Sequence, residues 1–324
     1  MSKKQHITSV GGQALIEGIM MQGPRGIATA VRKTDKSILV EYHKFTHLKD
    51  KNKFFGLPVI RGIVAFFESM IMGYKLLMYS AEASGMEDLE DVEMNKFEKW
   101  LTDKLGDKFM DIIMAFASLL GFALAFVIFF FLPVFVFNKL NSWTDMALTP
   151  WQGTIEGTMK IIIFVVYMLL VSQMKDIKRL FQYHGAEHKS IACYESGEEL
   201  TVENVKKCCR FHPRCGTSFM FVMLILSIVV VTLLSLVVPA ELKQNTIAWM
   251  FIKLPLIPLI MGIGYEFIRY AGKHDNLFVK IVSAPGLWMQ RITTKEPEDD
   301  IIEVGIASIK AVITDNIEDD EIKR

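Results

Sequence analysis

Residues 112–137 form a run of 26 positions without an ionisable side chain. An α-helix needs about 20 apolar residues to cross the hydrocarbon core of a bilayer, so this run is long enough to span one. Hydrophobic residues make up 51% of the chain and charged residues only 22%, which is too apolar for an ordinary soluble protein. The sequence therefore predicts an integral membrane protein that has the lipid bilayer as its first partner.

Three further apolar runs follow, at residues 155–174, 218–240 and 246–265. The first contains Glu156 and Lys160 near one end, where both side chains are expected to reach the headgroups. The last contains Lys253 and two prolines, Pro255 and Pro258, so we expect a kinked or broken helix there. Together with residues 112–137, these runs predict four transmembrane helices.

The short loops between the runs predict the orientation. Eight lysines and arginines lie in residues 175–217, against one each in residues 138–154 and 241–245. Loops rich in Lys and Arg stay in the cytosol, so 175–217 and, with four spans, both termini are expected to be cytosolic in a multi-pass protein of the cell membrane. The chain carries 36 basic and 36 acidic residues, and this balance gives no reason to expect nucleic acid as a partner.

The regions outside the runs have patterns of their own. Residues 27–33 and 37–43 are strand-like and flank a turn at Thr34–Lys36, which predicts a β-hairpin. In residues 58–83, charged side chains recur every seven positions on an otherwise apolar helix (Arg61, Glu68, Lys75 and Glu82). We expect this helix to lie on the inner leaflet, the alternatives being an ordinary packing helix and a fifth span.

These patterns predict a mostly α-helical membrane protein with four transmembrane helices, an interfacial amphipathic helix and a small N-terminal β-containing cytosolic unit. Four regions are expected along the chain: the β-containing unit at 1–57, an amphipathic and acidic helical region at 58–111, a four-helix membrane domain at 112–272 that includes the cytosolic hairpin 175–217, and a cytosolic helical tail at 273–324.

The cytosolic hairpin contains the sequence Tyr-His-Gly-Ala-Glu-His-Lys at 183–189. If the preceding span continues as a helix past the membrane surface, His184 and His188 lie one turn apart on one face, with Glu187 beside them. The pattern His-x-x-Glu-His is the inverted zincin motif, whose histidines bind zinc and whose glutamate acts as general base. Solvated interfacial histidines paired with Glu187 are the alternative.

A second cluster of donor residues ends the hairpin. His212 and Cys215 form a His-x-x-Cys pair in a loop that contains proline and glycine, and Arg214 lies between them. Glu266, at the expected cytosolic end of the fourth span, competes with His212 to be the third ligand. Arg214 is a candidate to stabilise charge on a substrate. Cys208 and Cys209 are adjacent and are not expected to share one tetrahedral site.

Several sequence blocks resemble one known family: GGQALIEGIMMQGPRG, YHGAEHKSIACYE, FHPRCGTSF, GYEFIRYAG and SAPGLWMQRITTKEPEDD. In this order along essentially the whole chain, they resemble the bacterial YqhQ-like family of membrane proteins, which are described as predicted metal-dependent enzymes without an assigned function. The positions that match the family are His184, Glu187, His188, His212, Arg214, Cys215 and Glu266. The resemblance implies that these positions are shared with predicted metal-dependent enzymes.

Two functions from different classes fit this inventory. The first is a membrane-embedded zinc hydrolase, most simply a protease for membrane proteins or peptides, with Glu187 as base and its active site at the cytosolic membrane face. The second is a scaffold or assembly factor in which His184, His188, His212 and Cys215 close a structural zinc site. Metal transport is disfavoured because the clear spans lack polar residues.

Overall fold

The computed structural model describes residues 7–85, 108–274, 276–314, 316 and 319–322. It confirms a mostly helical chain with a small N-terminal antiparallel sheet. By contacts between residues, the chain forms two compact units, Met1–Glu87 with Val165–Leu226 and Ile257–Arg324, and Asp88–Phe164 with Ser227–Leu256. The first unit combines segments from all four regions proposed from the sequence, because the N-terminal sheet, the hairpin 175–217 and the C-terminal helix share one core.

The sheet of the first unit is a four-stranded antiparallel meander in the order β1-β2-β3-β4. Its strands are β1 (Gly11–Leu15), β2 (Gly18–Gly23), β3 (Gly26–Arg32) and β4 (Ile38–His43). The hairpin predicted around residues 34–36 is therefore confirmed as β3–β4. The hairpin β1–β2 was not predicted, because its glycines hide the alternation of apolar residues that marks a strand.

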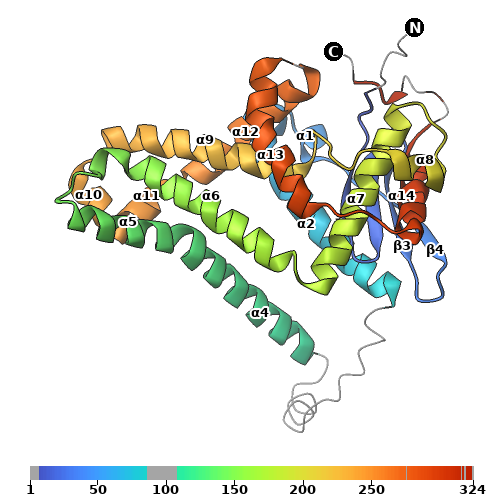
Figure 1. The fold of residues 1–324 in the computed structure, drawn as a ribbon, viewed down its shortest axis with the longest axis horizontal. Helices are drawn as coiled ribbons and strands as arrows, with labels where there is room; N and C mark the ends of the chain where they lie inside the picture. The colour runs from blue at the N-terminus through green and yellow to red at the C-terminus, as the bar shows by residue number, and fades with distance from the viewer. Residues whose placement is uncertain (1–6, 86–107, 275, 315, 317–318, 323–324) are drawn as a thin grey trace. The chain divides into compact units, whose positions relative to one another are not determined.

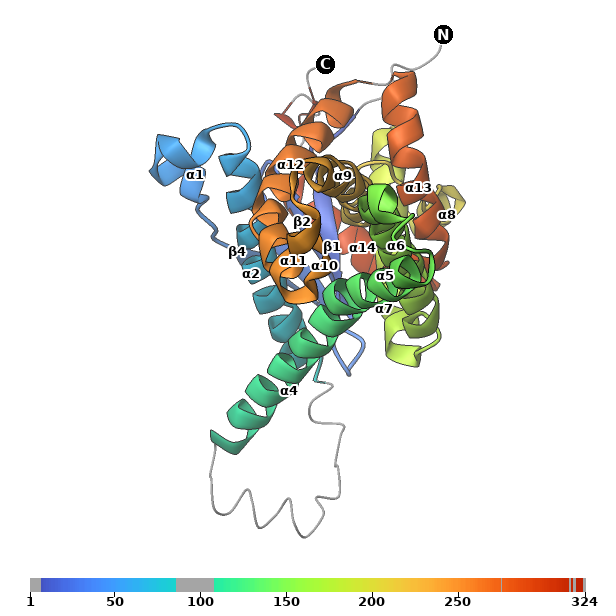
Figure 2. The same ribbon diagram turned by 90° about the vertical axis from the view of Figure 1, so that its left-hand side faces the viewer.

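Helices cover both faces of this sheet (Figure 1 and Figure 2). On one face, Leu76 of α2 (Ile60–Ser84) packs against Leu15, Met20 and Ile27. On the other face lie α7 (Lys175–Glu195) and α14 (Asp299–Val312), which form the largest apolar core with the sheet. Helix α14 lies within the tail for which the sequence predicted helical structure.

The remaining elements of the first unit are helices. They are α1 (Leu48–Lys51), the 3₁₀ helix η1 (Lys53–Gly56), α8 (Val202–Lys207), α12 (Leu256–Lys273) and α13 (Leu277–Thr293). The chain passes from one unit to the other within α6 (Gln152–Val171) and α9 (Gly216–Val237). Helix α6 ends before α7 begins, so the histidines lie on a separate helix and not on an extension of the span.

The second unit contains α4 (Lys108–Phe126), a π-helical turn η3 (Val127–Phe131), α5 (Leu132–Trp143), the 3₁₀ helix η4 (Thr149–Trp151), α10 (Ala240–Gln244) and α11 (Thr246–Lys253). Glu156 is almost completely buried and forms an ion pair with Lys253 of α11. The expectation that Glu156 reaches the headgroups is therefore wrong. Lys253, the last residue of α11, donates a hydrogen bond to the buried Glu156 carboxylate.

Five helices of the described chain are long and apolar enough to cross a membrane: Ile60–Ser84, Phe116–Trp143, Thr149–Val171, Phe219–Val237 and Thr246–Lys273. Four of them correspond to the four runs predicted from the sequence. The fifth is α2, for which the sequence analysis preferred an interfacial position. The span Thr246–Lys273 is broken between α11 and α12, as its prolines predicted.

Candidate metal centre

Three side chains place metal-binding atoms close together in the first unit. The donor atoms of His184, His188 and Cys215 all lie within 4.8 Å of one another. The two histidines are four residues apart on α7, so the helix turns both imidazoles to the same side, with ring centroids 4.4 Å apart. Cys215 comes from the loop before α9, and its Sγ lies 3.1 Å from His184 Nε2.

The outer nitrogen of each imidazole faces a backbone carbonyl. His184 Nδ1 lies 2.8 Å from the Thr293 oxygen, and His188 Nδ1 lies 2.6 Å from the Arg210 oxygen. Because a carbonyl only accepts hydrogen bonds, both Nδ1 atoms must carry the proton. The Nε2 lone pairs are then available to a metal, in the arrangement that orients metal-binding histidines in proteins.

The thiol is suited to the same role. Burial raises the pKa of Cys215, but the neighbouring His188 outweighs this effect and holds the pKa below its ordinary value. Burial also lowers the pKa of His188, which favours the neutral imidazole. A thiolate and neutral imidazoles are the forms that bind zinc, and catalytic zinc sites use three protein ligands drawn from histidine, cysteine and carboxylate side chains.

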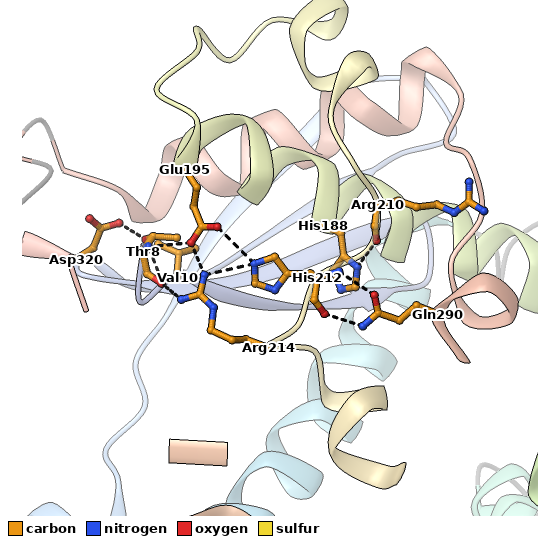
Figure 3. A network of polar contacts seen from close by, with 9 residues as sticks. All are labelled: Thr8, Val10, His188, Glu195, Arg210, His212, Arg214, Gln290 and Asp320. Atoms are coloured by element: carbon orange, nitrogen blue, oxygen red, sulfur yellow. Dashed lines mark hydrogen bonds and ion pairs between the residues drawn. The ribbon is translucent and has the colours of Figure 1, made fainter. Parts of the chain in front are cut away.

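The loop that carries Cys215 is held at three points (Figure 3). The Arg210 carbonyl accepts the hydrogen bond from His188. The His212 backbone is clamped by Gln290 of α13, whose Oε1 accepts from the His212 N–H at 2.8 Å and whose Nε2 donates to the His212 carbonyl at 2.7 Å. Arg214 binds the Glu195 carboxylate and the Thr8 carbonyl. These contacts fix the position of the cysteine against the histidines.

Glu187 lies beside the three donors. It shares with them the wall of a cavity of about 450 Å³. Its side chain is 5% exposed, and Oε2 has no hydrogen-bond partner among the residues that the structure describes. Burial raises the Glu187 pKa to about 8. Gly12 of β1 leaves room for this carboxyl, since a methyl group there would stand 3.1 Å from Glu187 Cδ.

The other predicted site residues take different places. His212 lines the cavity and its ring centroid lies 5.6 Å from that of His188, but its Nε2 faces Glu195 at 3.7 Å and it is not one of the three grouped donors. Glu266 is engaged by Arg61 of α2 through two hydrogen bonds. Of the donors expected from the sequence, Cys215 is therefore grouped with the two histidines, and His212 and Glu266 are not.

Arg214 was expected to stabilise charge on a substrate, but its contacts in the structure are with the protein. Its guanidinium is committed to Glu195 and Thr8, so it holds the loop and does not stand free for a substrate. Cys208 and Cys209 lie outside the grouped donors, and Cys209 is exposed.

Four residues that the sequence analysis missed hold this site: Thr8, Glu195, Gln290 and Thr293. None has a partner at motif spacing, because Thr293 lies 109 residues from His184 and Gln290 lies 78 residues from His212. Only Glu195 could have been suggested from the sequence, by its spacing from His188. It lies seven residues after His188 on the same helix, and two helical turns return to nearly the same face.

The three grouped donors and Glu187 fall within residues 57–315, which match the family model "Protein of unknown function (DUF1385)". The chain is also 35% identical to the uncharacterized protein YqhQ of Bacillus subtilis (strain 168) over 318 residues, which cover 97% of this chain and 95% of that protein. The chain belongs to this family. The resemblance to the YqhQ-like family inferred from the sequence is thereby confirmed. No solved structure matches the chain.

Proposed function

We propose that this protein is a membrane-embedded zinc hydrolase that cleaves peptide bonds at the cytosolic face of the cell membrane. The observation that carries the proposal is the convergence of His184, His188 and Cys215 on the wall of a cavity that also contains the Glu187 carboxyl. A structural zinc site takes four protein ligands, whereas a catalytic site keeps one position open toward a substrate. Three donors beside a cavity fit the catalytic type.

The residues divide the chemistry between them. Zinc held by the three donors would supply Lewis acidity to a peptide carbonyl. Glu187 in its ionised form takes a proton from the attacking water, the water oxygen bonds to the carbonyl carbon, and the carbon–nitrogen bond breaks. Glu187 then passes the proton to the leaving nitrogen, so that the products are a carboxylic acid and an amine. The burial of Glu187 keeps this proton transfer away from bulk water.

Metal removal tests the proposal directly. We expect the purified protein in detergent to cleave fluorescein-labelled β-casein, an unfolded protein, and 1,10-phenanthroline to reduce the rate at least about a hundredfold. The isomer 1,7-phenanthroline, which does not chelate, is the matched control and should leave the rate unchanged. Added Zn²⁺ should restore it. Cleavage that persists at the full rate after the metal has been removed would contradict the proposal.

For the membrane arrangement, we propose four transmembrane spans, with both termini in the cytosol and α2 on the surface of the inner leaflet. The excess of basic residues in 175–217 supports this orientation. The packing of α2 supports its interfacial position, because Leu76 packs on the sheet and Ser80 Oγ accepts a hydrogen bond from the Ile16 N–H. A sheet with open edges cannot lie in hydrocarbon, so its partner helix is kept at the surface. The opposite face of α2 exposes apolar side chains, which suits contact with lipid (Phe67, Met70, Ile71 and Tyr74).

Cysteine labelling in intact cells tests this topology. We expect Ser142→Cys, at an exposed position after the first predicted span, to react with an impermeant maleimide. Glu198→Cys, exposed in the hairpin, should react only after the cells are opened. The four native cysteines all lie between residues 193 and 215 and should also be protected, so the wild-type chain is the control. Labelling of Glu198→Cys but not Ser142→Cys in intact cells would show the reverse orientation.

A further inference from the structure

The first strand of the sheet forms the rim of the metal-centre cavity. Strand β1 is a terminal strand in the described sheet, with β2 on one side. Residues 9–14 line the same cavity as His184, His188 and Cys215. Gly11 and Gly12 are both exposed, and a methyl group at Gly11 would have no neighbour within 4 Å. A glycine pair in a strand is typical of a place where another backbone approaches closely.

The backbone of β1 turns alternate residues toward this rim. In an antiparallel ladder, successive residues direct their N–H and C=O groups to opposite edges. The N–H of Ile16, directly after β1, bonds to Ser80 Oγ of α2 and so points away from β2. The same alternation turns Ala14 to the edge of β1 that faces the cavity.

The cavity provides apolar surface next to this edge. Its lining includes apolar side chains from β1 and α7 and their flanking residues: Val10, Ala14, Leu180, Phe181 and Ile191. A peptide paired with β1 would direct every second side chain onto this surface. The upstream end of the strand is fixed, because Ser9 N–H donates to the Asp320 carbonyl and Ile7 accepts from the Ile322 N–H. The edge is therefore held in place before any ligand arrives.

We propose that β1 is the substrate-binding edge, and that an extended, apolar peptide segment adds to it as a further strand at Ala14, with its scissile bond beside His184, His188 and Cys215. This inference rests on the hydrolase function proposed above and names its substrate class. Strand addition gives affinity through the main chain and selects side chains only at alternate positions. It suits segments that are unfolded, whatever their sequence.

The experiment separates binding to the metal from pairing with the strand. The probes are acetohydroxamate, which contacts only a metal, and acetyl-Leu-Leu-Leu-hydroxamate, which adds an extended peptide. Affinity for the wild-type protein in detergent is measured by calorimetry. We expect the peptide probe to bind at least about tenfold more tightly than acetohydroxamate. N-methylation of one leucine amide should weaken the binding of the peptide probe about tenfold, and N-methylation of the next amide should have little effect.

A variant of the strand gives the reciprocal test. Ala14→Pro removes the N–H that faces the cavity, a change that an edge position tolerates. It should weaken the peptide probe about tenfold and leave acetohydroxamate binding unchanged, and Ala14→Ser, which keeps the N–H, is its control. If Ala14→Pro does not fold, the N-methyl series on the wild-type protein decides alone.

The outcomes distinguish the two proposals. If acetohydroxamate binds but the peptide probe is no tighter, or if its N-methylated forms bind equally well, strand addition is wrong and the hydrolase proposal stands. If neither hydroxamate binds zinc-loaded protein, the metal site is closed and the hydrolase proposal itself fails.

Discussion

Replacing His188 with alanine will remove the metal from the purified protein. His188 supplies one of three grouped donors and is itself oriented by the Arg210 carbonyl, so its loss leaves two donors and an unsatisfied carbonyl. We expect the zinc affinity to fall at least about a hundredfold. Mass spectrometry of protein purified from zinc-supplemented cells should then find less than about a tenth of the wild-type content.

The control variants separate the three donors that the structure groups from Glu266, which the sequence also suggested as a ligand. His184→Ala and Cys215→Ser should lose metal as His188→Ala does. Glu266→Gln should keep it, since Glu266 is paired with Arg61, and so should His274→Ala, whose side chain is exposed. Full zinc occupancy in His188→Ala, or its loss in Glu266→Gln with retention in Cys215→Ser, would show that the ligand set is wrong.

Replacing Glu187 with glutamine will abolish hydrolysis and leave the metal in place. The amide keeps the shape of the buried carboxyl but cannot take a proton from water. We expect casein cleavage to fall at least about a hundredfold, with zinc content and the thermal unfolding midpoint close to those of the wild type. Glu198→Gln, at an exposed position after α7, makes the same chemical change outside the cavity and should retain full activity.

The same variant distinguishes an enzyme from a scaffold. In a structural zinc site, a neutral side chain of equal size beside intact ligands preserves assembly. If Glu187→Gln fully complements a deletion of the gene while His188→Ala does not, the site is structural and the hydrolase proposal is refuted. Metal loss in Glu187→Gln would instead refute the role of Glu187 as a base that does not bind the metal.

Local patterns predicted the parts of the site that lie on one element. The spacing of His184 and His188 on a helix follows directly from 3.6 residues per turn, and the structure places both on one face of α7. The hydrophobic runs predicted the long apolar helices for the same reason. The His-x-x-Cys pair indicated a ligand loop but not which of its two donors faces the histidines.

Long-range contacts decided what the sequence left open. The Gln290 clamp and Arg214 place the loop so that Cys215, and not His212, reaches the histidines. Glu266 looked like a ligand because a carboxylate at the end of a span has no partner nearby in sequence, and its partner Arg61 lies 205 residues away. Pairings at this separation carry no local signal.

The contacts that hold the metal centre come from distant points along the chain, and this sets when the centre can form during synthesis. Gln290 and Thr293, which fix the His212 loop and His184, follow all four apolar runs in the sequence. Asp320, which binds Thr8 beside Arg214, is translated later still. The ribosome therefore delivers every membrane segment to the bilayer before these supports exist. A nascent chain has no assembled centre while its own extended segments are exposed, so the proposed hydrolysis would begin only after insertion is complete.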